Sequence, residues 1–340
     1  MKLLKSSLFG YIQRAISRFL FPIESDQWLG LLRFGLGAHV CFYCWSLRRD
    51  WTNLLGQSDN ALFGRELSEA ILSVTSPFIP RAGWFLSAAE YVGVPEILAL
   101  DLLWVAFVVA GFCLLGGLFC RAAAIAAFVI HLAVAKSSNL LAYGMESFTT
   151  IGLFYLMIAP LPDNASMDHR LRKANSTSIW RLGFHRRVLQ LHLCAVYLFG
   201  GVAKSLGSGW WNGSSVWRAL VRPPFNVISP EILVRLKMLF PILGMGVLVL
   251  ELGYPIFIWP RRTRYVWLLT ILSMHVAIGI AMGLYLFALI MIILNLAAFG
   301  PQLGARRPGI DRKRLRGAKS GGAEAIPRLG FHSTSREKSR

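Results

Sequence analysis

Apolar residues along the chain gather in eight stretches, which are separated by polar segments of varied length. Each stretch is about 17–23 residues long, the length at which an α-helix crosses a hydrocarbon core of about 30 Å. We therefore predict an all-α fold, a polytopic membrane helix bundle with about eight spans. The predicted spans are residues 28–47, 97–119, 122–141, 146–162, 188–206, 239–259, 265–281 and 284–300.

The last two predicted spans belong to one continuous apolar run. A single helix of that length would extend beyond the bilayer, because an α-helix rises by about 1.5 Å per residue. We therefore predict a break near Met282–Gly283.

The N-terminal segment alternates apolar and basic residues at helical spacing. In MKLLKSSLFGYIQRAISRFLFPI, one helical face carries Leu4, Leu8, Tyr11, Ala15 and Phe19, and the basic residues occupy the remainder. This pattern is typical of an amphipathic helix that lies on a membrane surface. The chain is thus divided into an interfacial helix (1–24), a membrane domain (25–300) and a basic, polar tail that we expect to be disordered and cytoplasmic (301–340).

The basic charge of the chain is distributed unevenly between its loops. The chain is 55% hydrophobic, and its net charge is +19. With the N-terminus inside, 25 Lys and Arg residues fall in inner segments and 8 in outer segments. The positive-inside rule therefore places both termini in the cytoplasm. No folded basic domain with interleaved aromatic residues is visible, so nucleic-acid binding is not expected and anionic membrane lipids are the expected partners.

Several ionisable residues lie inside predicted spans, where they are costly unless they face the bundle interior or a partner. They are His39, Asp101, His131, Lys136, His192, Lys204, Glu251 and His275. A lone intramembrane histidine is more often a hydrogen-bonded core residue than a ligand. The histidines occupy separate spans, so no metal site is predicted, and the five cysteines imply no disulfide framework.

Lys204 lies near the outer end of the fifth predicted span. Its side chain could simply reach the lipid headgroups from there. However, Gly200 and Gly201 precede it by one helical turn and Tyr197 by two, all on the same face. Small residues allow another backbone or a ligand to approach. Desolvation in such a pocket would favour the neutral amine, which can act as a general base. For Glu251, His275 in the next span is the partner we expect.

The segment QLHLCAVYLFGGVAKSLGSGWWNGSSVW (190–217) resembles the best-marked part of the vitamin K-dependent γ-carboxylase membrane domain and its bacterial relatives, the horizontally transferred transmembrane (HTTM) domain proteins. The spaced residues that fit are Tyr197, Gly201, Lys204, Trp211, Asn212 and Gly213. Three further stretches resemble other helices of that family: RFGLGAHVCFYCW, NLLAYGMESFTTIGLFYLMIAPLPDNASMD and ELGYPIFIWPRRTRYVWLLTILSMHVAIGIAMGLYLFALIMI.

The resemblance implies a multi-pass enzyme of the bacterial inner membrane. Lys204 matches the lysine that deprotonates reduced vitamin K in the carboxylase, and His131 and His275 are further catalytic candidates. A quinol or lipid-like pocket would use Tyr197, Gly200, Gly201, Trp211 and Glu251. Carboxylation of a secreted peptide or protein at glutamate is one outcome that the resemblance implies. The chain departs from the family at Ala203-Lys204, where the carboxylase has two adjacent lysines.

Two other functions compete with the enzyme. The chain could be a non-catalytic membrane partner or maturation factor for a secreted peptide, with its contacts in the outer segments 48–96 and 207–238. A transporter is less favoured, because many transporters contain repeated halves and no internal repeat is evident here.

Overall fold

The structure is a computed structural model that describes residues 2–56, 65–138, 143–172 and 179–301. All the secondary structure in these ranges is helical. A helix coincides with each of the eight predicted spans, because long apolar runs that are free of internal breaks satisfy their backbone groups within the helix. These helices are α2 (Gln27–Leu47), α6 (Glu96–Gly116), α7 (Cys120–Ser137), α8 (Met145–Ile158), α10 (Ile179–Ser205), α14 (Phe240–Phe257), α15 (Arg261–Met282) and α16 (Tyr285–Phe299).

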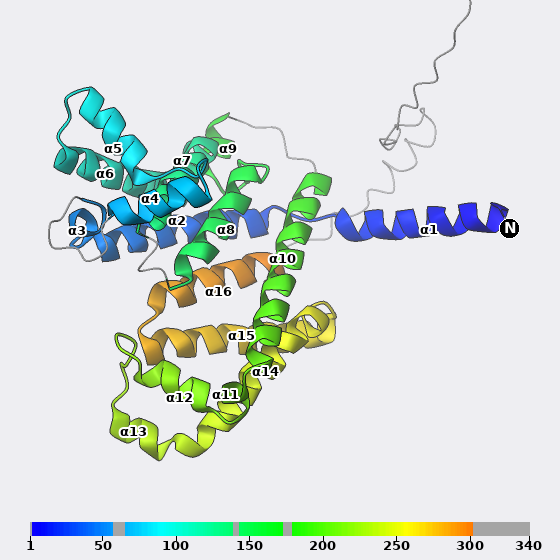
Figure 1. The fold of residues 1–340 in the computed structure, drawn as a ribbon. Coiled ribbons are helices and arrows are strands. Elements are labelled where there is room, and N and C mark those ends of the chain that lie inside the picture. Colours follow the sequence, from blue (N-terminus) through cyan, green and yellow to red (C-terminus); the bar gives the residue numbers. More distant parts are fainter. Residues whose placement is uncertain (1, 57–64, 139–142, 173–178, 302–340) are drawn as a thin grey trace, which may run out of the picture. The chain divides into compact units, whose positions relative to one another are not determined.

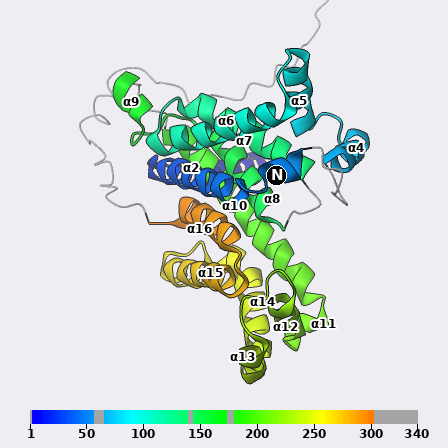
Figure 2. The same ribbon diagram turned by 90° about the vertical axis from the view of Figure 1, so that its left-hand side faces the viewer.

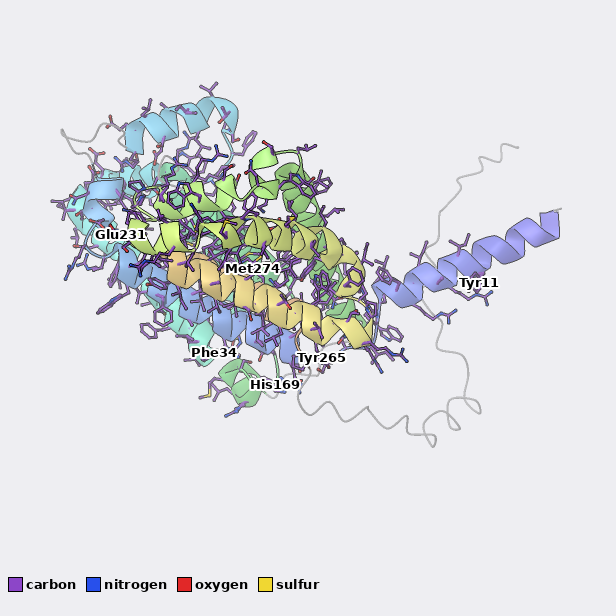
Figure 3. All side chains as sticks on the ribbon, turned by 90° about the horizontal axis from the view of Figure 1, so that it is seen from below. Tyr11, Phe34, His169, Glu231, Tyr265 and Met274 are labelled. Carbon is purple, nitrogen blue, oxygen red and sulfur yellow. The ribbon has the colours of Figure 1, made fainter. Side chains whose placement is uncertain are left out.

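Five of the helical segments are long and apolar enough to cross a membrane, which identifies a multi-pass membrane protein. They are Glu96–Gly116, Cys120–Ser137, Trp180–Ser205, Lys237–Phe257 and Arg261–Met282. Helices α8 and α16 are apolar but shorter. Large apolar side chains also point outward: Phe34 on α2 is 59% exposed and Tyr265 on α15 is 58% exposed (Figure 3). Membrane lipids are natural neighbours for such surfaces.

The predicted break between the last two spans is confirmed. Helix α15 ends at Met282, and Gly283 follows with a φ of 70°. This left-handed conformation is typical of the residue that ends a helix, and glycine adopts it without a steric penalty. The chain then reverses into α16 (Figure 1). Helix α10 differs from the prediction at its start: it begins at Ile179 rather than near 188, because basic residues interrupt the apolar run in its first turns.

The long helices form two groups that meet at α16. Helix α2 packs against α6, α8 and α16, and α7 packs against α6 and α8. In the other group, α10 packs against α14, and α15 packs against α14 and α16. Helix α16 contacts α2 and α8 as well as α10 and α15, so it connects the groups (Figures 1 and 2).

Arginine side chains close the C-terminal ends of four helices. Arg33 donates to the carbonyls of Leu114 and Leu115 at the end of α6. In the same way, Arg121 reaches the end of α8, Arg186 the end of α16 and Arg264 the end of α14. The last carbonyls of a helix have no partner within it, and a cation there also complements the helix dipole. Part of the basic charge of the chain is therefore structural.

Short helices occupy the predicted outer segments. They are α3 (Trp51–Leu55), α4 (Arg65–Thr75), α5 (Ala82–Tyr91), α11 (Ser208–Trp211), α12 (Ser214–Val221), α13 (Pro230–Arg235) and η2 (Lys237–Leu239), and α9 (Met167–Arg172) follows α8. The N-terminal segment forms α1 (Lys2–Leu20), on which Tyr11 is exposed (Figure 3). The predicted tail lies outside the described residues, apart from Pro301.

Candidate functional site

Helix α10 approaches α14 closely at Gly201. A Cβ atom at Gly201 would lie 3.0 Å from the backbone nitrogen of Leu252 and 3.1 Å from the Cβ of Glu251. Such spacing is tighter than ordinary van der Waals contact, so glycine sets the distance between the two helices. At the neighbouring Gly200, a Cβ would meet the Glu251 carboxylate at 3.5 Å and the Lys204 ammonium at 3.7 Å. The two glycines thus lie next to a charged pair, which Lys204 and Glu251 form.

Lys204 and Glu251 form that pair. The ammonium nitrogen lies 2.7 Å from Oε1 and 2.6 Å from Oε2 of the carboxylate. The lysine side chain is 29% exposed and the glutamate side chain 9%. Within the described chain, these are the hydrogen bonds that the two charged groups make, and the ring of Trp210 lies 5.5 Å from the ammonium. Glu251 is therefore paired with Lys204, and not with the histidine we expected from the sequence.

His275 belongs to a buried hydrogen-bond network beside this pair. Its Nε2 lies 2.8 Å from the hydroxyl of Tyr197, which also lies 2.8 Å from Nδ2 of Asn295. The hydroxyl of Tyr254 donates to Oδ1 of Asn295 at 2.7 Å. The rings of Tyr197 and Tyr254 pack against each other, with centroids 4.1 Å apart. The network thus joins α10, α14, α15 and α16.

The directions of these hydrogen bonds assign the tautomer of His275. Nδ2 of Asn295 also contacts the carbonyl of Met291, which can only accept, and this contact fixes the orientation of the amide. Asn295 therefore donates to Tyr197. We assign the single hydroxyl proton of Tyr197 to Nε2 of His275, its other hydrogen-bond partner within the described chain. The neutral imidazole then carries its proton on Nδ1. That Nδ1 is buried and has no hydrogen-bond partner among the residues that the structure describes.

The ion pair offers a route for a proton. Moving a proton along the 2.6 Å contact would convert the pair into a neutral amine and a neutral acid. The amine is then a general base and the carboxyl group holds the proton.

The structure places the remaining predicted residues elsewhere. His131 lies on α7, where its Nε2 contacts the carbonyl of Glu146 at 3.0 Å and its ring packs edge-on against Tyr43. Trp211 is 52% exposed, and its indole donates to the carbonyl of Ser205 at the end of α10. It is Trp210 that faces Lys204.

Sequence reasoning missed Asn295, Tyr254 and Trp210. A single amide within the run YLFALIMIILNLAAF is the signal that could have identified Asn295, since an unpaired amide in a membrane helix is costly. Among the residues that the structure describes, no group of three or more His, Cys, Asp or Glu side chains could hold a metal ion.

Comparisons of the chain with family models, curated proteins and solved structures give no match.

Proposed function

We propose that this membrane protein binds a quinol, or a similar lipid-like compound with a hydroxyl group, and removes a proton from it with Lys204. The observation that carries the proposal is the Lys204–Glu251 pair, which lies on the two helices that Gly201 brings together. The resemblance to the γ-carboxylase membrane domain and its HTTM relatives points to the same lysine. Carboxylation of a peptide glutamate is one outcome of such chemistry.

The buried Nδ1–H of His275 supports a ligand with an oxygen acceptor. A buried donor without a partner costs about 1–3 kcal/mol, and a carbonyl or hydroxyl oxygen removes that cost. Tyr197 and Asn295 hold the imidazole so that this nitrogen, and not Nε2, carries the proton. His275 is thus a binding residue in this proposal.

Lys204 and Glu251 both take part in the proton transfer. Transfer of the ammonium proton to the carboxylate leaves a neutral amine, which accepts the proton of the ligand hydroxyl. Glu251 returns its proton when the ligand leaves. His131, on a separate set of helices, has no part in this step.

We further propose eight spans with both termini in the cytoplasm of a bacterium. In that topology, α6, α8, α14 and α16 are the helices that run inward. They are the four whose C-terminal ends are closed by arginines. Basic residues that serve both as helix caps and as inner-side charges support this orientation.

A spectroscopic probe tests the base directly. The full-length protein in lipid nanodiscs is mixed with 1-naphthol, a lipid-like hydroxyl compound whose ionised form has its own absorption band. We expect ionised naphthol to be bound at a pH at which naphthol in lipid alone is neutral. Lys204→Ala should abolish the band, because the amine that accepts the proton of the ligand hydroxyl is gone, and Lys237→Ala should keep it.

Equal bands in the Lys204→Ala protein and the unmodified protein would overturn the proposal. Loss of the band together with loss of the folded state, measured by size-exclusion chromatography, would instead assign Lys204 a structural role. The non-catalytic partner of a secreted peptide would then be the better hypothesis.

A further inference from the structure

A second polar site lies in the predicted outer segment 48–96, apart from the lysine site. Helices α4 and α5, the residues that follow α5 and the first residue of α6 line a half-open cavity of about 530 Å³. This volume is within the range of small-molecule sites. The charged residues that line it are Arg65, Glu66, Glu69, Arg81, Glu90 and Glu96, and Trp84 also lines it.

One wall of the cavity is fixed to the membrane helices. Oε1 of Glu69 accepts hydrogen bonds from the backbone nitrogen of Gly83 at 2.9 Å and from the hydroxyl of Ser137, on α7, at 2.6 Å. A Cβ atom at Gly83 would overlap the Glu69 carboxylate. Arg81 donates to the carbonyls of Glu69 and Pro77. These bonds hold α4, α5 and α7 in one arrangement.

Two buried guanidinium donors, on residues that line the cavity, lack a partner among the residues that the structure describes. Arg65 is only 8% exposed; its Nη2 lies 3.4 Å from Glu96, but its Nη1 makes no hydrogen bond. Nε of Arg81 is buried and likewise without an acceptor. Guanidinium donors bind carboxylate oxygens most strongly. A ligand with an anionic oxygen group would therefore satisfy these two donors.

The acidic residues of the lining disfavour binding of a ligand that carries negative charge alone. Four glutamates line the cavity against two arginines. Glu69 accepts two hydrogen bonds, and Glu96 is paired with Arg65. The side chain of Glu90, which also lines the cavity, is exposed. A ligand with negative charge alone would be repelled by this excess, and a ligand with positive charge alone would leave the two arginine donors without acceptors.

We propose that this cavity binds a small zwitterion of the α-amino acid class. Its carboxylate accepts from Nη1 of Arg65 and Nε of Arg81, and its ammonium lies toward Glu90. Binding here is independent of proton chemistry at Lys204, since the two sites share no residue.

Three matched probes test the proposal on the full-length protein in lipid nanodiscs. They are L-alanine, which has both charges, acetate, which has the carboxylate only, and ethylammonium, which has the cation only. Binding is measured by isothermal titration calorimetry. We expect L-alanine to bind at least about tenfold more tightly than either single-charge probe, because it satisfies both charged walls.

Two variants locate the binding. Glu90→Gln removes a charge from an exposed side chain of the lining and should weaken L-alanine binding about tenfold. Glu231→Gln, on α13, changes an exposed glutamate outside the cavity and should leave the affinity unchanged. Arg65→Gln should abolish binding; because Arg65 is buried, its folded state is checked by size-exclusion chromatography.

Three results with the probes would overturn the proposal: no heat with L-alanine, acetate binding as tightly as L-alanine, or ethylammonium binding as tightly as L-alanine. The first would mean that water fills the cavity. The other two would mean a site for an anion or a cation. Unchanged affinity in the Glu90→Gln protein would place any L-alanine binding outside the cavity, and would also overturn it.

Discussion

Among the ion pairs that join different parts of the described chain, Arg33–Asp163 and Lys204–Glu251 differ in how completely they are enclosed. Arg33 and Asp163 are 3% and 1% exposed, and the remaining donors of the arginine are used by the carbonyls at the end of α6. Lys204 and Glu251 are 29% and 9% exposed, and each group bonds only the other within the described chain. The first pair is saturated with partners, whereas the second has capacity left for a ligand.

The histidines repeat this contrast. Oγ1 of Thr149 lies within hydrogen-bond distance of the carbonyl of Met145 and of Nε2 of His39. We assign its single proton to the carbonyl, so that Nε2 of His39 donates to Thr149. Nε2 of His131 donates to a backbone carbonyl. Both rings therefore leave a bare Nδ1 lone pair inside the protein, whereas His275 leaves an Nδ1–H. An unpaired donor can bind a ligand oxygen. This donor belongs to the same group of helices as the Lys204–Glu251 pair, which has hydrogen-bonding capacity left.

The largest expected effect is on stability, at the saturated pair. Asp163→Asn leaves the Arg33 guanidinium buried without a counter-charge, and we expect a loss of about 3–5 kcal/mol in the free energy of unfolding. Denaturant titration in detergent micelles, followed by circular dichroism, measures this loss. A change below about 1 kcal/mol would mean that the pair is hydrated and that the contrast between the two pairs does not hold.

A smaller effect is expected where α10 meets α14. Gly201→Ala places a methyl group about 3.0 Å from the Leu252 backbone nitrogen, so the helices must separate, at a cost of about 1–3 kcal/mol. Gly200→Ala is the matched control, because its methyl group meets the charged pair at 3.5 Å or more. The same denaturant titration compares the two variants. Equal stabilities would show that Gly201 does not set the helix distance.

The Lys204–Glu251 pair should contribute less to stability than to function. In Glu251→Gln, the amide oxygen still accepts from Lys204, and the lysine side chain is 29% exposed, so we expect a loss of only about 0–1 kcal/mol. The lysine then stays charged, because no carboxylate can take its proton, and 1-naphthol should no longer be ionised. A large loss of stability would make this pair structural, like Arg33–Asp163.

Much of the helical layout follows from the sequence, because apolar runs define membrane helices directly. The break at Gly283 was predictable from the length of the last run. Tyr197, Gly200, Gly201 and Lys204 were predicted to lie on one face, since spacings of three, four and seven residues are fixed by helix geometry. These predictions needed only the rise and turn of a helix.

Contacts between helices could not be predicted in the same way. Glu251 was expected to meet His275, but which side chain it meets depends on the rotation of α14 and on its closeness to α10. Hydropathy contains neither quantity. Asn295 was missed for the same reason: its role exists only where α10, α14 and α16 bring Tyr197 and Tyr254 to its amide.

The smallest expected difference concerns the histidines: which ring nitrogen carries the proton in His275, beside the lysine site, and which in His39 and His131. Selectively ¹⁵N-labelled histidine, studied by NMR in lipid nanodiscs, distinguishes a protonated from a bare ring nitrogen. We expect Nδ1–H for His275 and Nε2–H for His39 and His131, with signals assigned by single His→Gln variants. Adding 1-naphthol should shift only the His275 signal, because only that ring offers a donor next to the lysine site. Nε2–H at His275 would reverse the direction of the Tyr197 hydrogen bond. The case for an oxygen ligand would then rest on Lys204 alone.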